Sequence, residues 1–181
     1  KEEMGLIREP SECDRICSSL KDNGGVYFVP AFTGLGAPYW NSKVRGAILG
    51  LTRGTGGDYI VRAGIEAIAY QVAELILLMQ KETGIAGDVM RVDGGVCACD
   101  FLMQFQADIS EAEVMLAQSP ETTALGAELL AGLASGVFSD RAEILQKLGG
   151  GACYRPQMRA NERAALLSGW KRAVAACRAF E

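Results

Sequence analysis

Residues 90–106 read Met90-Arg-Val-Asp-Gly-Gly-Val-Cys-Ala-Cys-Asp-Phe-Leu-Met-Gln-Phe-Gln106, which predicts a buried strand, a glycine pair and then a helix. Gly94 and Gly95 lack a Cβ atom, so the backbone there can adopt positive φ and approach a ribose or a phosphate closely. The next helix adds the positive end of its dipole. The pattern fits a nucleotide site. It also fits an ordinary strand-to-helix turn, because a lone glycine pair is less specific than a complete phosphate-binding loop.

The segments before this stretch alternate between helix and strand patterns. Helical patterns cover residues 4–20 and 59–82, and Asp58 is a credible N-cap of the second. Strand patterns cover residues 26–29, 46–51 and 89–93. One apolar face of the helix over 59–82 is expected to be covered by other parts of the fold, and it consists of Val61, Ile65, Ile68, Val72, Leu75 and Met79.

The segments after it continue the alternation. The sequence predicts a helix over 101–109, a strand over 113–116 and a helix that Ser119-Pro120 opens and Gly136 ends. Two polar helices follow over 140–148 and 160–180, and the last has an apolar stripe of Leu166, Leu167, Trp170, Val174 and Cys177. Alternating strands and helices are typical of an α/β sheet, so we expect a single α/β domain over residues 1–181.

The composition excludes several classes of protein. The chain has 181 residues, of which 49% are hydrophobic and 22% charged, as in one folded globular domain. The net charge is −4 and the basic residues are scattered, which argues against a nucleic-acid surface. Charged and amide side chains interrupt the most apolar segment, residues 60–79, so we expect no membrane span. The polar start of the chain, with no apolar signal segment, favours the cytoplasm.

Histidine is absent and the six cysteines have no metal-binding spacing. Without histidine, Ser-His-Asp and Cys-His catalysis are excluded. Cys13-x-x-x-Cys17 and Cys97-x-Cys99 lack the two-residue spacing of a zinc knuckle, so we expect reduced, partly buried thiols and assign no metal ligand.

No catalytic residue can be assigned from the sequence. Asp93 and Glu66 are acids that could be considered as a base. A cap of the glycine turn explains Asp93 more readily, and a polar helix face explains Glu66.

Four blocks of the sequence resemble the C-terminal part of the FGGY carbohydrate kinases. The first reads Pro30-Ala-Phe-Thr-Gly-Leu-Gly-Ala-Pro-Tyr-Trp40, and the others cover residues 45–54, 91–95 with 101–108, and 123–127 with 131–134. Within that family, the loop Gly34-Leu-Gly36 resembles the corresponding loop of glycerol kinases. Relatives acting on xylulose or gluconate usually carry a Gly-Glu-Arg type of loop at this place.

This resemblance implies an α/β actin-like ATPase (ribonuclease-H-like) domain, truncated at its N-terminal end, with ATP and Mg as cofactors. It places the nucleotide between two such domains and glycerol mainly on the other one. The implied nucleotide contact is Gly95, with Gly94 beside it, and a family asparagine contact falls on Cys99. A thiol is a weaker hydrogen-bonding group than an amide, so this contact is lost or passes to Asp100.

The implied function is ATP-dependent phosphorylation of glycerol to glycerol 3-phosphate. In the family, the catalytic aspartate and the glycerol-binding side chains precede the part that is similar to this chain, so we expect the chain alone to be inactive. Its expected partners are ATP or ADP, glycerol in the full-length enzyme, and a second copy of itself through an unpaired sheet edge. Two alternatives remain, a non-catalytic actin-like module that binds nucleotide or a protein partner, and an FGGY kinase of another sugar or polyol.

Overall fold

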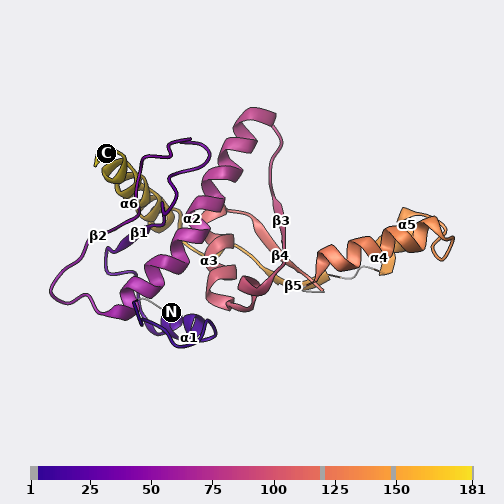
Figure 1. Ribbon diagram of the computed structural model, residues 1–181, viewed down its shortest axis with the longest axis horizontal. Coiled ribbons are helices and arrows are strands. Elements are labelled where there is room, and N and C mark those ends of the chain that lie inside the picture. The colour runs from indigo at the N-terminus through magenta and orange to yellow at the C-terminus, as the bar shows by residue number, and fades with distance from the viewer. Residues whose placement is uncertain (1–3, 119–120, 148–149, 181) are drawn as a thin grey trace.

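The computed structural model describes residues 4–118, 121–147 and 150–180. A main body contains two small sheets and four helices, and two further helices project from it as an arm (Figure 1). In chain order the elements are α1 (Glu12–Ser19), β1 (Tyr27–Val29), β2 (Ala47–Leu49), α2 (Gly57–Thr83), β3 (Val89–Val92), the 3-10 turn η1 (Gly95–Ala98), α3 (Asp100–Ser110), β4 (Glu113–Ala117), α4 (Thr122–Ala134), α5 (Arg141–Lys147), β5 (Gly150–Tyr154) and α6 (Ala160–Ala179).

The strands form two separate sheets. β1 and β2 make an antiparallel hairpin, with Phe28 opposite Ile48. The second sheet has the order β3-β4-β5, in which β3 runs parallel to β4 and β5 runs antiparallel to β4. β5 carries no strand pattern in the sequence and was not predicted, because a run that starts with two glycines has little intrinsic strand preference. Its strand conformation comes from pairing with β4, which lies far from it in sequence.

The long helix α2 lies at the centre of the body and contacts α1, α3 and β1. The expectation that its bulky apolar face is covered was wrong for half of its six residues, although Ile65 packs against the core and Val72 is half-buried. Val61 is buried, but Ile68, Leu75 and Met79 are 37%, 40% and 64% exposed. The helix instead buries a face built mainly from alanines, Tyr70 and Glu66. Small side chains allow the neighbouring helices to approach closely, which a row of isoleucine and leucine would prevent.

A buried polar cluster joins α2 to the N-terminal part of the chain. Glu66, which is only 1% exposed, accepts hydrogen bonds from Arg62 Nε at 2.8 Å, Asn23 Nδ2 at 3.1 Å and the Tyr70 hydroxyl at 3.3 Å. The expectation that Glu66 belongs to a polar helix face was therefore wrong, because its carboxyl lies in the buried core. Glu66 pairs with the buried guanidinium of Arg62. The pKa of its carboxyl is raised, mainly by burial, and Arg62 partly offsets this rise.

Several helix boundaries differ from the sequence analysis. α1 begins at Glu12 and not at residue 4, because Gly5 takes a positive φ and Pro10 has no amide hydrogen to donate. The N-cap of α2 is Gly56, and Asp58 lies inside the first turn. α4 begins at Thr122, and the expected opening at residues 119–120 lies outside the described residues.

The last helix, α6, agrees well with the sequence analysis. Its apolar stripe packs into the main core, where Trp170 stacks on Tyr70 with ring centroids 5.1 Å apart. Val174 and Cys177 are buried in the same core. The C-terminal helix thus completes the body that holds α2 and α3.

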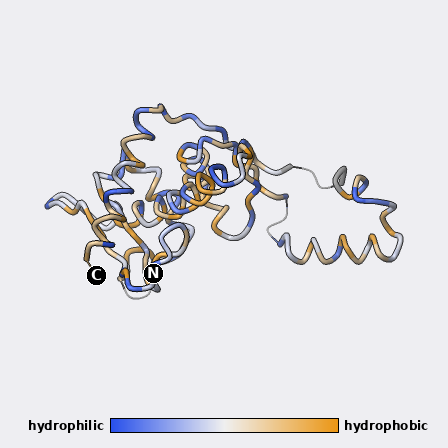
Figure 2. Tube along the Cα trace, turned by 90° about the horizontal axis from the view of Figure 1, so that it is seen from above, coloured by the Kyte–Doolittle hydropathy of each residue, from blue (hydrophilic) through white to orange (hydrophobic). Residues whose placement is uncertain are grey.

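The arm formed by α4 and α5 stands away from this body (Figures 1 and 2). Within its described residues, α4 has no buried side chain although its composition is apolar. Gly136 follows its end with φ +77°, as expected for a glycine that stops a helix. In the part of the chain that the structure describes, no helix is both long and apolar enough to cross a membrane.

Candidate nucleotide site

The glycine turn, residues 93–99, connects β3 to α3. Gly94 has φ +94° and ψ 171°, a conformation that other residues rarely adopt, so a glycine is required there by the backbone. Gly95 begins η1, and its φ lies outside the positive region. A Cβ atom added at Gly95 would meet no protein atom within 4 Å. Neither the backbone nor a described neighbour therefore explains why residue 95 is a glycine.

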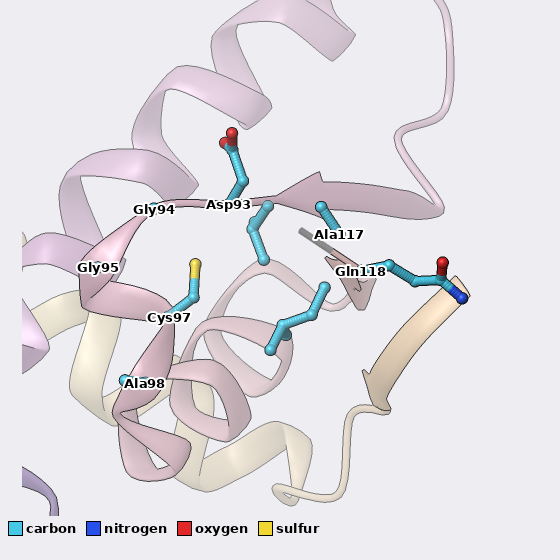
Figure 3. A pocket seen from close by; sticks show the side chains of 9 residues that line it. Asp93, Gly94, Gly95, Cys97, Ala98, Ala117 and Gln118 are labelled. Carbon is cyan, nitrogen blue, oxygen red and sulfur yellow. The ribbon is translucent and has the colours of Figure 1, made fainter. Parts of the chain in front are cut away.

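A cavity of about 240 Å³ opens beside this turn at the carboxyl ends of the parallel strands β3 and β4 (Figure 3). Residues 92–95, Cys97 and Ala98 line one side of it, and residues 116–118 at the end of β4 line the other. The carboxyl ends of neighbouring parallel strands are the usual place for ligands in α/β sheets. The structure thus brings the predicted Gly94 and Gly95 to the edge of a cavity.

Side chains of the cavity wall offer little hydrogen bonding toward the glycines. The Cys97 thiol points into the space between the glycine turn and the end of β4, whereas the Gln118 amide points away from the glycines (Figure 3). Burial raises the pKa of Cys97, and the nearby Asp93 raises it further, so this thiol stays protonated at neutral pH. A ligand here would meet backbone groups and apolar surface.

Asp93 does not cap the glycine turn, contrary to the sequence-based expectation. Its carboxylate accepts a hydrogen bond from the Thr122 hydroxyl at the start of α4. Figure 3 shows the carboxylate on the side of the strand end away from Cys97. Asp93 therefore connects the turn to the arm.

Cys99 occupies the N-cap position of α3 and is not among the residues that line the cavity. Its thiol lies 3.7 Å from Asp14 Oδ1, on α1. Burial is the main cause of a raised pKa at Cys99. The Cys99 thiol is thus directed at the carboxylate of Asp14 in the main body.

Asp100, the residue that could take over a contact from Cys99, already has a partner. The Tyr154 hydroxyl on β5 donates to Asp100 Oδ1 at 2.6 Å. This hydrogen bond is the main reason that the pKa of Tyr154 rises to about 12. Sequence reasoning missed both Tyr154 and Asp14, and no local pattern marks them, because they approach the turn from distant segments.

The six cysteines are free thiols, and Cys13, Cys17, Cys97 and Cys177 are buried. Among the described residues, no group of three or more cysteine, aspartate or glutamate side chains is arranged to hold a metal ion. The candidate site is therefore defined by the glycine turn and its cavity.

A sequence profile of the FGGY family of carbohydrate kinases, C-terminal domain, matches residues 5–135. The chain belongs to the FGGY family of carbohydrate kinases. Its similarity to curated FGGY proteins extends further, over nearly the whole chain. It is 48% identical to a glycerol kinase of Shewanella piezotolerans over 178 residues, which is 98% of this chain and 36% of the relative. It is also 47% identical to a glycerol kinase of Lachnoclostridium phytofermentans, covering 96% of this chain and 35% of the relative.

Solved FGGY structures have the same fold. The crystal structure of Plasmodium falciparum glycerol kinase with ADP superposes with a TM-score of 0.89 at 36% identity, over 95% of this chain and 34% of that one. A ligand-bound xylulose kinase from Lactobacillus acidophilus superposes with a TM-score of 0.79 at 24% identity, over 97% of this chain and 36% of that one. These matches confirm the expected actin-like α/β fold. The chain spans about a third of the length of the relatives that it matches.

Proposed function

We propose that this chain is the C-terminal, nucleotide-binding part of an ATP-dependent glycerol kinase, which converts glycerol and ATP to glycerol 3-phosphate and ADP. The observation that carries the proposal is Gly95. Its missing Cβ faces open space at the rim of a cavity, where neither backbone conformation nor protein packing requires a glycine. A bound ribose or phosphate would explain the glycine, because it needs the space that a side chain would fill. The similarity to an ADP-bound glycerol kinase supports a nucleotide as that ligand.

The proposed roles of the turn residues follow from their placement. The backbone of Gly94 and Gly95 would lie against the nucleotide. Cys99 would be a weak contact at most, since its thiol is directed at Asp14. When bound, Mg would neutralise charge on the transferring phosphoryl group. The described residues of this chain offer no group of acids for the ion, so other parts of the enzyme and the ATP phosphates would hold it.

Neither of the two acids considered as a base, Glu66 and Asp93, is free to act on glycerol. Glu66 is enclosed in the buried cluster with Arg62, and Asp93 is bound to Thr122. A general base must reach the hydroxyl whose proton it accepts. We therefore propose that the aspartate acting on glycerol belongs to another part of the enzyme, and that this chain alone phosphorylates glycerol at a negligible rate. Sustained glycerol-dependent ATP turnover by the chain would contradict this.

The proposal is tested by calorimetric titration of the chain with Mg-ADP, repeated on Gly95→Val. Gly36→Val is a matched control, because a Cβ added at Gly36 also meets no atom within 4 Å and Gly36 lines a different cavity, beside Tyr39 and Trp170. We expect binding to the unaltered chain and to Gly36→Val, and its loss in Gly95→Val. Equal affinity of Gly95→Val would contradict the placement of the nucleotide. No binding to the unaltered chain at millimolar Mg-ADP would contradict an autonomous nucleotide site.

A non-catalytic nucleotide- or partner-binding module is the second candidate. The position of Cys99 favours it, because the thiol replaces the amide that the family resemblance implies. Cys99→Asn separates the two candidates: tighter Mg-ADP binding by this variant indicates a site built on the kinase plan, and unchanged binding favours the module. The substrate choice between glycerol and another polyol, the single domain over residues 1–181, the cytoplasmic location and the homo-oligomeric state stay predictions.

A further inference from the structure

Helix α3 begins without a side-chain cap of its own. Cys99 is its N-cap residue, and the side chain of Cys99 makes no capping hydrogen bond. The first amide groups of a helix have no partner within the helix, and an N-cap serine, threonine, asparagine or aspartate normally accepts from the second or third of them. A thiol is a weak acceptor and serves this purpose poorly. The helix that follows the nucleotide turn thus needs a cap from elsewhere.

Asp14, in the first turn of α1, provides that cap. Its Oδ1 accepts the amide hydrogen of Phe101 at 2.7 Å, although the two residues lie 87 positions apart. Phe101 is the second residue of α3, so this is the bond that an N-cap side chain would accept. The same oxygen lies 3.7 Å from the Cys99 thiol. A carboxylate at this place also interacts favourably with the positive end of the helix dipole.

Arg62 fixes α1 in the position from which Asp14 reaches α3. One guanidinium nitrogen donates to the carbonyl oxygens of Cys17 at 3.2 Å and Leu20 at 2.6 Å, at the end of α1. The guanidinium carbon lies 4.8 Å from the ring centroid of Phe101. Phe101 is therefore held through its backbone by Asp14 and through its ring by Arg62.

We infer that Asp14 is a positioning residue, which caps α3 in place of residue 99 and thereby holds the glycine turn in the conformation that opens the cavity. The effect on the nucleotide rests on the proposed function; the capping does not. α1 contains no residue of the cavity wall, so Asp14 acts on the site only through the turn.

Amide hydrogen exchange tests the capping directly. In Asp14→Ala we expect the Phe101 amide to exchange about tenfold faster, with α2 amides unchanged, because one local hydrogen bond is lost. Glu12→Ala is the matched control, since it removes an acid from the same helix without touching α3. The double variant Asp14→Ala/Cys99→Ser should restore protection, because serine is a good N-cap residue. Unchanged protection in Asp14→Ala, or no restoration in the double variant, would overturn the inference.

Titration with Mg-ADP tests the consequence for the site. We expect Asp14→Ala to weaken binding by about three- to tenfold, and the double variant to regain most of it, because a loosened turn must be ordered again on binding. Asp14→Asn keeps an acceptor oxygen and should resemble the unaltered chain, which provides a folded comparison if Asp14→Ala is unstable. Lost Phe101 protection with unchanged affinity would overturn the positioning role. If neither the unaltered chain nor any variant binds Mg-ADP, the proposed function fails. The hydrogen-exchange data still show whether Asp14 caps α3.

Discussion

At the scale of single residues, the backbone requires a glycine at residue 94 but not at residue 95, and this difference can be measured. Gly94 needs its positive φ, so Gly94→Ala should lower the free energy of unfolding by about 1 kcal/mol or more. Gly95→Ala adds a Cβ into open space and should change it by less than about 0.5 kcal/mol. Denaturant unfolding of both variants measures this. Equal destabilisation would show that Gly95, too, is required by the fold.

The exposed thiol of Cys153 gives a second residue-scale prediction. Its pKa is raised, mainly because the thiol donates to Glu113 at 2.9 Å. The carboxylate stabilises the protonated thiol, so the reactive thiolate forms only at higher pH than for an ordinary cysteine. In Glu113→Gln the pKa should fall, and alkylation of Cys153 at pH 8 should become several-fold faster. Rates measured by mass spectrometry against pH check this, with Glu111→Gln as control. If the pH midpoint of Cys153 alkylation is the same in Glu113→Gln as in the unaltered chain, the prediction is wrong.

The residues of the candidate site were predictable from sequence only where the signal is local. Gly94 and Gly95 stand between a strand pattern and a helix pattern, and the structure places them beside a cavity. Asp14 and Tyr154 bind the first residues of α3, and they lie 87 and 54 positions away from their partners in the sequence. Their positions depend on how α1 and β5 pack against the body, which no local pattern encodes.

At the scale of elements, α2 shows which of its faces stabilises the fold. Glu66→Ala leaves the buried Arg62 guanidinium without its carboxylate and should destabilise the chain by about 3–5 kcal/mol. Met79→Ala removes a larger apolar side chain that is mostly exposed, and should cost less than about 0.5 kcal/mol. Thermal or denaturant unfolding compares them. A larger effect of Met79→Ala would mean that the bulky face of α2 is covered in solution.

The elements themselves were largely predictable, and their faces and partners were not. The strands at 26–29, 89–93 and 113–116 and the helices at 59–82 and 101–109 appear within a few residues of the expected bounds, whereas α1 begins eight residues later than the pattern over 4–20. The exposed part of the α2 face was predicted wrongly because hydrophobic periodicity does not show which apolar positions pack closely against neighbouring helices. Close helix packing here selects alanines. β5 was missed because its conformation depends on a partner strand.

At the scale of the whole molecule, stability should be unevenly distributed between the body and the arm. Within its described residues, α4 buries no side chain, whereas α2 and α3 share the core. Amides in α4 should therefore exchange at least about 100-fold faster than those in the middle of α2. Hydrogen exchange at two protein concentrations measures this. Protection of α4 equal to that of α2, or rising with concentration, would instead show that the arm packs against a second copy.

The way the arm is inserted also sets the order in which the chain can fold. Residues 118–149 separate β4 from β5, so this strand pair closes a long loop before it gains any contact. By contrast, the contacts between α2, α3, β3 and β4 join segments that follow one another closely in the chain. Contacts between nearby segments form faster than contacts between distant ones. We therefore expect the glycine turn to form early in folding, and the hydrogen bond from the Tyr154 hydroxyl to Asp100 to form late, because it depends on the pairing of β5 with β4.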